Sequence, residues 1–481
     1  MPRLPASLPR LVFAAVLTAT AIATPACDRL PGAASSGRAA DLKPGQVQVL
    51  LSALSEAPSH GFQPGAFGEQ GLAERLDDGD RAARAQLRQA ALAYARALRG
   101  YAIPRRAMDP AWGARSAQYD AEAEFTAAAQ AGRLDAWAKA LPPSSSQYQA
   151  LRAAYADYQK IQAAGGWPQL SDSGTLRAGA GGPAVASLRA RLAVEDPAAD
   201  AGAGDRFDAA LAEAVRRAQL RYGQHPTGEA DADLRTALNT PVEARLAQIR
   251  ANLERLRWLP RRLEADRIEA NSAAGLVDVY RGGRPVLSMR AAAGKPGDET
   301  PLLASKVDRI VLNPTWNVPD SIANDEILPK GPGYLQRLGF VETAGEEGVR
   351  LVQQPGPENA LGQVKFLFDN RYSVYLHDTP AKAAFAREQR SVSHGCVRLE
   401  RALDLAQLLL STQPGWSPDR IATTLASGET TEVKLDRPVQ VILAYMTAFA
   451  QAGGVTAFRP DVYGWDAEVL RRLDAQKPGS A

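Results

Sequence analysis

The spacing of hydrophobic residues changes near residue 260, and this change constrains the fold more than any other feature. Before it, ARAQLRQAALAYARALRG and YQALRAAYADYQKIQAAGG repeat apolar residues at helical intervals and end on glycine. After it, LVDVYRG and RPVLSMRAAAG flank Gly282-Gly283 and predict a hairpin, while VDRIVLNP and RYSVYLHD predict two further strands. A chain of 481 residues is expected to hold more than one domain. We therefore predict a multidomain α+β protein whose C-terminal half is mostly β.

Breaks in this pattern set the domain boundaries that we expect. Residues 47–170 read as a helical scaffold domain, in which Ser146 is placed to cap a helix whose apolar stripe should face a core. Residues 174–240 read as a compact three-helix unit, with Asp205 placed to cap its second helix and Gly223 to end it. A connecting helix over 241–260 ends before Pro260.

The charge balance gives no sign of a nucleic-acid partner. The chain has 56 basic and 53 acidic residues, a net charge of +3. No dense basic run with interleaved aromatic residues stands out, as nucleic-acid binding would favour. Partners must therefore be inferred from individual sites.

The N-terminus predicts export. An apolar run, LVFAAVLTATAI, follows two arginines and is too short to span a bilayer, as in a signal peptide over residues 1–26. Ala21-Ile22-Ala23 offers a simple cleavage site, whereas Thr24-Pro25-Ala26-Cys27 resembles a lipobox in which Cys27 carries lipid. Both readings stay open. We expect the periplasm or cell envelope as the location, with residues 27–46 as a flexible tether.

Export makes the second cysteine informative. The chain has two cysteines, so Cys27 and Cys396 form the only pair that a disulfide could join. Cys27 lies in the predicted tether, and lipid on its sulfur would forbid the pair. A lone thiol in an oxidising compartment is a hazard unless it has a function, which directs attention to Cys396.

Two of the four histidines lie close to this cysteine in the sequence. If RYSVYLH is a strand, His377 leaves the face opposite its apolar residues, and Ser393-His394-Gly395-Cys396-Val397-Arg398 follows directly before a predicted helix. A helix N-terminus would lower the pKa of the Cys396 thiol. Gly395 would let backbone N–H groups reach an oxyanion, and Arg398 would bind a substrate carboxylate through two parallel hydrogen bonds.

These residue types are those of a cysteine acyl-transfer site. The thiolate attacks an amide carbonyl, and an imidazole gives a proton to the leaving amine. Three alternatives compete: a metal site built from His377, His394 and Cys396, which would need a fourth ligand, histidines that are merely hydrogen-bonded in a core, and a structural Cys396, which export disfavours.

The motif H-x15-S-H-G-C-V-R resembles the signature of the L,D-transpeptidase (YkuD-type) catalytic domain. The chain around it resembles the large Gram-negative subgroup, through YQALRAAYADYQ…GGWP, PVEARLAQIRANLERLRWLP, NPTWNVPDSIANDEILPKGP and YLHDTP. Residues 174–240 resemble a peptidoglycan-binding domain through G-x-x-V-x-x-L and F-x-x-A-x-x-x-A-V-x-x-x-Q; a purely structural three-helix module is the alternative. The resemblance implies a catalytic domain over 261–463, with a capping insertion at 314–365 and a C-terminal helix and tail at 464–481.

The resemblance also assigns roles. It implies that Cys396 is the nucleophile, that His377 is the acid and base, and that the Asp378 carbonyl orients His377. His394 and Gly395 line the site, although a structural role for His394 is an equal alternative. The substrate-binding candidates, for which packing competes at Trp316, are Arg398, Tyr375, Trp316, Asn317 and Tyr334.

The implied reaction needs no metal and no organic cofactor. The enzyme would cleave the diaminopimelate–D-Ala bond of a tetrapeptide stem and join the acyl group to a second stem as a 3→3 cross-link. Carbapenems should acylate Cys396, and peptidoglycan is the expected partner, with partner synthases unidentified. A hydrolase (an L,D-carboxypeptidase) with the same site and a non-catalytic peptidoglycan-binding protein remain alternatives.

Overall fold

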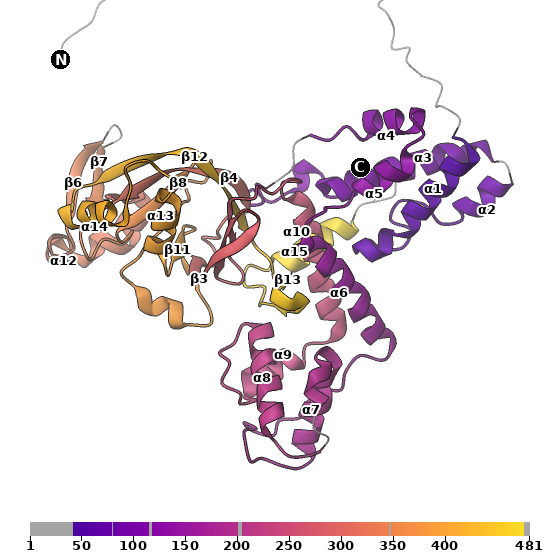
Figure 1. The fold of residues 1–481 in the computed structure, drawn as a ribbon, viewed down its shortest axis with the longest axis horizontal. Coiled ribbons are helices and arrows are strands. Elements are labelled where there is room, and N and C mark those ends of the chain that lie inside the picture. Colours follow the sequence, from indigo (N-terminus) through magenta and orange to yellow (C-terminus); the bar gives the residue numbers. More distant parts are fainter. Residues whose placement is uncertain (1–41, 79, 115–117, 201–203, 346–347, 476–481) are drawn as a thin grey trace, which may run out of the picture. The chain divides into compact units, whose positions relative to one another are not determined.

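The computed structural model describes residues 42–475 apart from 79, 115–117, 201–203 and 346–347 (Figure 1). The predicted signal peptide, Cys27 and residues 476–481 of the tail lie outside the described residues. The tether was predicted to end at residue 46, but helix α1 (Pro44–Ser55) already begins at Pro44 and Leu42 is buried. Within the described residues, no helix combines the length and hydrophobicity that a membrane crossing requires.

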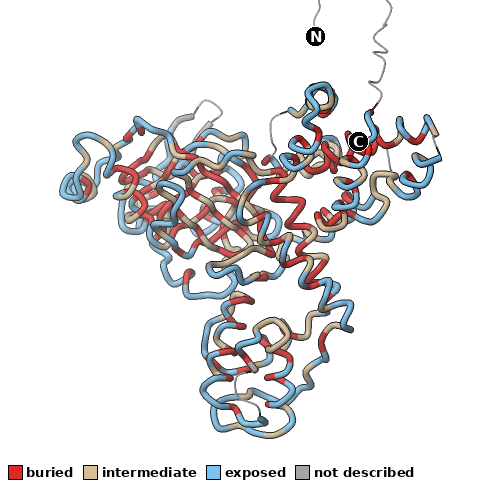
Figure 2. The backbone as a smooth tube through the Cα atoms, turned by 45° about the vertical axis from the view of Figure 1, so that its right-hand side comes forward, coloured by how far each residue is buried: buried red, intermediate tan, exposed pale blue. Residues whose placement is uncertain are grey.

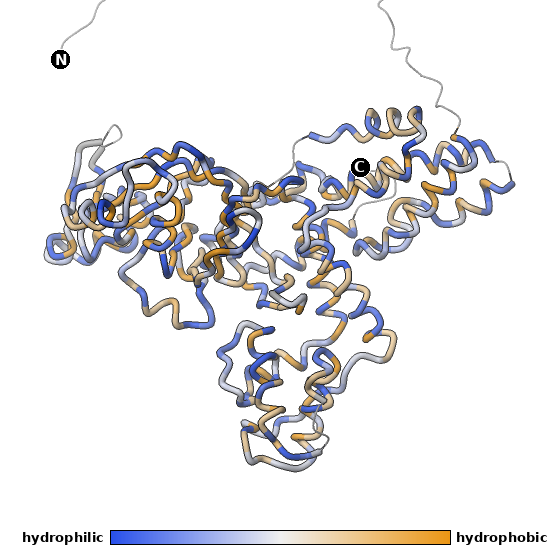
Figure 3. Tube along the Cα trace, viewed as in Figure 1, coloured by the Kyte–Doolittle hydropathy of each residue, from blue (hydrophilic) through white to orange (hydrophobic). Residues whose placement is uncertain are grey.

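The N-terminal region is helical, as the sequence predicts. It comprises α1, α2 (Leu72–Asp77), α3 (Arg81–Arg96), α4 (Ala121–Gln130), α5 (Leu134–Ala140) and α6 (Ser146–Ala163). Hydrophobic and hydrophilic stretches alternate along these helices (Figure 3). The apolar faces of α1 to α5 share one core with Trp258 and Trp465 of the C-terminal half, whereas the buried residues of α6 belong to a second core. The cap of α6 is Ser145, not Ser146, because the Ser145 side chain accepts from the Tyr148 N–H.

The predicted three-helix unit consists of α7 (Pro183–Glu195), α8 (Ala209–Tyr222) and α9 (Ala232–Leu238). Gly223 ends α8 in the left-handed conformation, as expected. The cap of α8 was placed wrongly, since Asp208 rather than Asp205 accepts from the Leu211 N–H.

Helix α10 (Val242–Trp258) is the predicted connecting helix, and it is buried on almost every side near its C-terminal end (Figure 2). The buried charges near that end are paired: Glu254 accepts from Arg257 Nη1 at 2.6 Å and from Trp258 Nε1 at 2.8 Å, and Arg255 pairs with Asp466. A buried charge is tolerated only when it is neutralised and hydrogen-bonded in this way. We assign these groups a structural role.

A nine-stranded mixed sheet forms the C-terminal domain, in the order β10-β3-β11-β9-β8-β4-β12-β1-β2. Because β2 also pairs with β3, the sheet closes on itself like a barrel. The predicted hairpin is confirmed, with Gly282 and Gly283 both at positive φ between β2 and β3. The strands are β1 (Arg267–Asn271), β2 (Leu276–Arg281), β3 (Arg284–Gly294), β4 (Leu303–Leu312), β8 (Val364–Phe368), β9 (Leu376–His377), β10 (Ser391–Ser393), β11 (Val397–Leu399) and β12 (Thr431–Ala444).

Two strand predictions near the site are wrong in part. The strand expected over RYSVYLHD is only β9, because Ser373 has φ 54° and interrupts the extended backbone. Strand β8 begins at Val364, inside the segment predicted as insertion. Helix α13 (Ala402–Leu410) does follow the cysteine, but β11 comes between them.

The capping insertion lies between β4 and β8 and has a small core of its own. It holds α11 (Asp320–Ile322), the π-turn Ala323–Ile327, α12 (Pro332–Arg337) and a three-stranded sheet. The order of that sheet is β5 (Trp316–Asn317), β7 (Gly348–Gln353), β6 (Phe340–Gly345). Its apolar residues form a cluster separate from the core of the main sheet.

The remaining elements complete the C-terminal domain. Helix α14 (Pro418–Ser427) precedes β12, and the short strands β13 (Ala448–Ala450) and β14 (Thr456–Phe458) form a hairpin after it. Helix α15 (Trp465–Asp474) ends the described chain and is the predicted C-terminal helix.

Candidate active site

Parallel pairing of β9 with β11 brings the histidine and the cysteine together. Arg398 lies opposite His377 and Val397 lies opposite Leu376, and the Val397 N–H donates to the Tyr375 carbonyl at 3.1 Å. Because side chains alternate along a strand, Leu376 and Val397 face the core, where they are 0% and 2% exposed. The opposite face therefore carries Tyr375, His377, Cys396 and Arg398.

His377 is held in one orientation. Its Nδ1 lies 2.5 Å from the Asp378 carbonyl oxygen. A carbonyl can only accept a hydrogen bond, so this contact assigns the proton of the neutral ring to Nδ1 and leaves Nε2 with a lone pair. Burial, together with the smaller effects of the positive charges of Arg398 and Lys365, lowers the pKa of His377 to about 3. The ring is therefore a neutral imidazole at neutral pH.

The Asp378 side chain fixes the carbonyl that orients this histidine. Its Oδ2 accepts from the Gln363 N–H at 2.9 Å, and its Oδ1 accepts from Lys382 Nζ at 2.5 Å. Gly362 has φ 60°, and a Cβ there would lie 2.3 Å from Asp378 Oδ2, so only glycine fits. Both carboxylate oxygens of Asp378 are thus held by hydrogen bonds.

Cys396 does not lie at a helix N-terminus, contrary to the sequence-based expectation. It precedes β11, and α13 begins only at Ala402. Burial raises the pKa of the Cys396 thiol, an effect that the hydrogen bond with Tyr375 and the charge of Arg398 offset in part. The cysteine is consequently a thiol at neutral pH, without a disulfide partner among the described residues.

Tyr375 lies against both reacting groups. Its ring meets that of His377 edge to face, with centroids 5.6 Å apart. Burial and the neighbouring Cys396 raise the pKa of the Tyr375 phenol, which therefore remains a hydrogen-bond donor. The phenol is close enough to hydrogen-bond with the thiol.

A tight turn positions the cysteine. Gly395 has φ 103°, and its N–H donates to Ser393 Oγ at 3.2 Å, while its carbonyl accepts from Thr300 Oγ1 at 2.8 Å. Ser393 Oγ in turn donates to the Cys396 carbonyl at 2.5 Å. The N–H of Gly395 itself is thus engaged within the turn.

His394 contacts the capping insertion. Its Nε2 lies 2.7 Å from Glu326 Oε1 and 3.3 Å from Lys295 Nζ. This imidazole is therefore engaged in a charged cluster, whereas His377 lies on the face that carries the cysteine.

The predicted contacts from the insertion pack within it. The Trp316 ring lies 6.3 Å from that of Phe340, and the Tyr334 ring stacks on Phe340 at 6.4 Å. Both belong to the insertion's own core, and Asn317 is exposed. The packing alternative fits Trp316 in this structure, and it fits Tyr334 as well.

Three residues near the site were missed from the sequence. Lys365 lies opposite His377 on β8, and the alternation in VKFLF, with Val364, Phe366 and Phe368 buried, could have predicted it. Lys295 and Glu326 come from a loop and from the insertion, and no sequence pattern pairs them. Among the described residues, no group of three or more His, Cys, Asp or Glu side chains could hold a metal ion.

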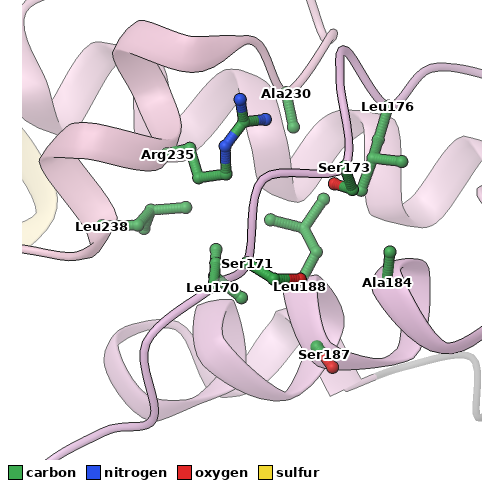
Figure 4. Close-up of a pocket in the computed structure, with 10 residues that line it drawn as sticks. All are labelled: Leu170, Ser171, Ser173, Leu176, Ala184, Ser187, Leu188, Ala230, Arg235 and Leu238. Carbon is green, nitrogen blue, oxygen red and sulfur yellow. The ribbon is translucent and has the colours of Figure 1, made fainter.

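A separate pocket lies in the three-helix unit (Figure 4). Its lining includes Leu176, Leu188 and Arg235. The Arg235 guanidinium is fixed by the Gly174 carbonyl at 2.7 Å and by Asp172 Oδ1 at 2.8 Å. This pocket is built from residues far from Cys396 in the sequence and shares none of the site described above.

Comparisons with known proteins confirm the resemblance. Three family models match: a scaffold domain over residues 40–154, a putative peptidoglycan binding domain over 181–238, and the L,D-transpeptidase catalytic domain over 265–439. A putative L,D-transpeptidase of Haemophilus influenzae is 32% identical over 250 residues, which are 48% of this chain and 50% of that protein. The chain thus spans about half the length of this curated relative.

Solved structures of L,D-transpeptidases also match. The one from Xylanimonas cellulosilytica is 17% identical with a TM-score of 0.19, and the match covers 57% of this chain and 98% of that one. The one from Mycobacterium smegmatis is 18% identical with a TM-score of 0.20, over 37% of this chain and 58% of that one.

Proposed function

Since residues 265–439 belong to the L,D-transpeptidase catalytic-domain family, we propose that this protein is a peptidoglycan L,D-transpeptidase with Cys396 as its nucleophile. Cys396 attacks the carbonyl of the diaminopimelate–D-Ala bond in a tetrapeptide stem and expels D-Ala. The acyl group then passes to the side-chain amine of a second stem, which makes a 3→3 cross-link. The observation that carries this proposal is the shared sheet face of Cys396 and His377, with His377 Nδ1 bonded to the Asp378 carbonyl.

The pKa shifts support a mechanism that starts from a neutral pair. At neutral pH the thiol keeps its proton and the imidazole is neutral, with its one ring proton on Nδ1. As the S–C bond forms, the thiol proton passes to His377 Nε2, which accepts it as general base. The Tyr375 phenol donates toward the sulfur and stabilises its developing negative charge.

The same imidazole completes both halves of the reaction. His377 gives the proton to the D-Ala nitrogen as the C–N bond breaks, leaving a thioester on Cys396 and a neutral ring. The acceptor amine then attacks the thioester and loses a proton to His377. That proton returns to the sulfur as the cross-linked product leaves, so the enzyme ends in its starting protonation state.

The other domains fit a substrate that is an extended polymer. Residues 181–238 match a putative peptidoglycan binding domain, and we propose that they hold the wall near the catalytic domain. An effective concentration raised by such tethering assists a reaction between two stems of one network. The substrate lies outside the cytoplasm, which agrees with a predicted signal peptide and with a lipid on Cys27 as the proposed anchor. Carbapenems, whose strained amide carbonyl is an acyl donor, are proposed to acylate Cys396.

A product analysis tests the function. The full chain is mixed with disaccharide-tetrapeptide, and the products are identified by mass spectrometry. A dimer that has lost one D-Ala is the expected result, and the Cys396→Ala variant should give none. Monomeric disaccharide-tripeptide alone would mean that water resolves the thioester, as in an L,D-carboxypeptidase. Unchanged substrate would contradict catalysis and favour a wall-binding protein.

A further inference from the structure

A carboxylate from the capping insertion lies among basic side chains near Cys396. Glu326 Oε1 is 2.7 Å from His394 Nε2 and 3.8 Å from Lys295 Nζ. Its negative charge also acts on Arg398, whose pKa it raises against the lowering effect of burial. Lys295, His394 and Arg398 come from the main domain and are called the carboxylate site below.

The carboxylate site is not neutralised by the main domain itself. Lys295 has one acidic partner there, Asp298, at 3.3 Å. Among the described residues, Arg398 forms no ion pair within 4 Å, and its Nε is buried without a hydrogen-bond partner. A buried guanidinium nitrogen without an acceptor is costly, so a second carboxylate at this place would be stabilised.

The position of the carboxylate site suits a substrate acid. Arg398 lies two residues after Cys396 on the same sheet face, and His394 lies two residues before it. In a peptide with a C-terminal amino acid, the carboxylate is separated from the scissile nitrogen by one carbon atom. A cation beside the nucleophile can therefore reach the carboxylate of the leaving residue.

We propose that Glu326 is a placeholder for the substrate carboxylate: it occupies the carboxylate site until the terminal carboxylate of the donor stem displaces it. This inference rests on the proposed function for the identity of the donor. The exchange is between like groups, so little charge is left unpaired at any stage. A donor without a free acid has no negative charge to offer these cations in place of Glu326.

The strength of the contact agrees with a replaceable partner. The Glu326 side chain is 46% exposed and that of Lys295 is 43% exposed. Half-exposed ion pairs are weak and are screened by salt. A substrate carboxylate positioned by further contacts along the stem can therefore compete with Glu326.

Alkylation of Cys396 by matched reagents tests the proposal without using transpeptidation. Iodoacetate carries a carboxylate and iodoacetamide does not, while in both the same sulfur attacks the CH2 carbon and iodide leaves into solution. With Glu326→Gln, the ratio of the iodoacetate rate to the iodoacetamide rate should rise by about threefold to tenfold, because the site has lost its own anion. The ratio cancels any change in thiolate fraction, since both reagents share the nucleophile.

Asp325→Asn is the matched control. Asp325 is exposed, precedes Glu326 in the same turn, and forms no ion pair within 4 Å among the described residues. This variant removes one negative charge from the insertion and should leave the ratio as in the wild type. Equal ratios in wild type and Glu326→Gln would overturn the proposal, as would an equal rise in both variants.

A second comparison links the site to the donor. Wild type should prefer disaccharide-tetrapeptide over its C-terminal amide, and Glu326→Gln should strengthen that preference, because the acid no longer has an anion to displace. An unchanged preference would overturn the role of Glu326 in selecting the acid. If no variant forms cross-links while the alkylation ratio still rises, the proposed function fails and the carboxylate site stands.

Discussion

The two sides of the candidate active site are built differently. On one side, His377 lies on β9 and Cys396 directly precedes its partner strand β11, and the opposite faces of these strands are buried in the core of the nine-stranded sheet. On the other side, the capping insertion packs around Phe340 in a core of its own and contacts the cysteine loop through half-exposed charges. Backbone pairing and burial hold the residues of the first side in position. The second side is held against the cysteine loop by ion pairs that solvent weakens.

This difference indicates a division of labour. Proton transfer requires distances that vary little, and a buried strand pair supplies them. Substrate entry requires a cover that can leave, and exposed ion pairs with a small separate core suit that need. The predictions below test this division, beginning with the largest effect.

Removing the sulfur should abolish the chemistry and spare the fold. Cys396→Ala is expected to lower cross-link formation by about a thousandfold or more, to the limit of detection. Its circular dichroism spectrum and melting temperature should stay near those of the wild type, because the side chain is small. Residual turnover above background, checked by product mass spectrometry, would mean that another group is the nucleophile.

Removing the base should have the next largest effect. His377→Asn is expected to reduce the rate of acylation by about a hundredfold to ten-thousandfold, since no other described group is oriented to take the thiol proton. The matched control is His394→Asn, which should affect acylation much less. Rapid-quench measurement of thioester formation compares the two, and a larger loss in the His394 variant would reverse our assignment of roles.

Truncating a phenylalanine in each of the two cores should destabilise different parts of the molecule. Phe366→Ala removes a fully buried ring from the main core and should lower the free energy of unfolding by about 3–5 kcal/mol. Phe340→Ala should instead loosen only the insertion. Hydrogen exchange should then accelerate in the described residues of 316–353 and stay slow in β9 and β11. An equal loss of global stability in both variants would contradict the separation of the two cores.

The pH dependence of thiol reactivity tests the neutral pair. Because burial raises the pKa of Cys396 above its ordinary value of 9.0, the thiolate fraction grows with pH until that higher pKa is passed. Alkylation by iodoacetamide should rise about tenfold per pH unit and continue to rise beyond pH 9. A plateau that begins near neutral pH would indicate a thiolate–imidazolium pair.

Of the two sides of the site, the insertion should respond more to salt, and this effect is the smallest. Raising NaCl from about 0.05 M to about 0.5 M shortens the screening distance and should speed hydrogen exchange in residues 320–330 by about twofold to threefold. Exchange in β9 and β11 should not respond. In the Glu326→Gln variant, the exchange rate of this segment should not change with salt. A salt response equal to that of the wild type would argue against the ion pair.

Much of the fold followed from the sequence because its signals are local. The change of hydrophobic period located the helical half and the sheet, and Gly282-Gly283 located a hairpin. Helix α10 was predicted within two residues at its C-terminal end, since Pro260 cannot continue a helix. Boundaries that depend on one hydrogen bond, such as the caps Ser145 and Asp208, were missed by one to three residues.

The candidate site was predictable in its membership and not in its electrostatics. The spacing of His377 and Cys396 was visible in the sequence, but the partner strands were not, so the helix argument for a lowered thiol pKa was wrong. The burial of the thiol depends on which residues pack around it in the folded protein, and the sequence alone does not reveal them. The Glu326 contact joins residues 68 positions apart and leaves no periodic signal.

The central claim is that Cys396 carries the acyl group between donor and acceptor. The most direct measurement is to mix the full chain with disaccharide-tetrapeptide, quench the reaction, digest the protein, and map the adduct by mass spectrometry. We predict the donor mass less D-Ala on the peptide that contains Cys396, lost again when an acceptor stem is added. Cross-linked product formed without this adduct, or with the adduct on another residue, would contradict the account.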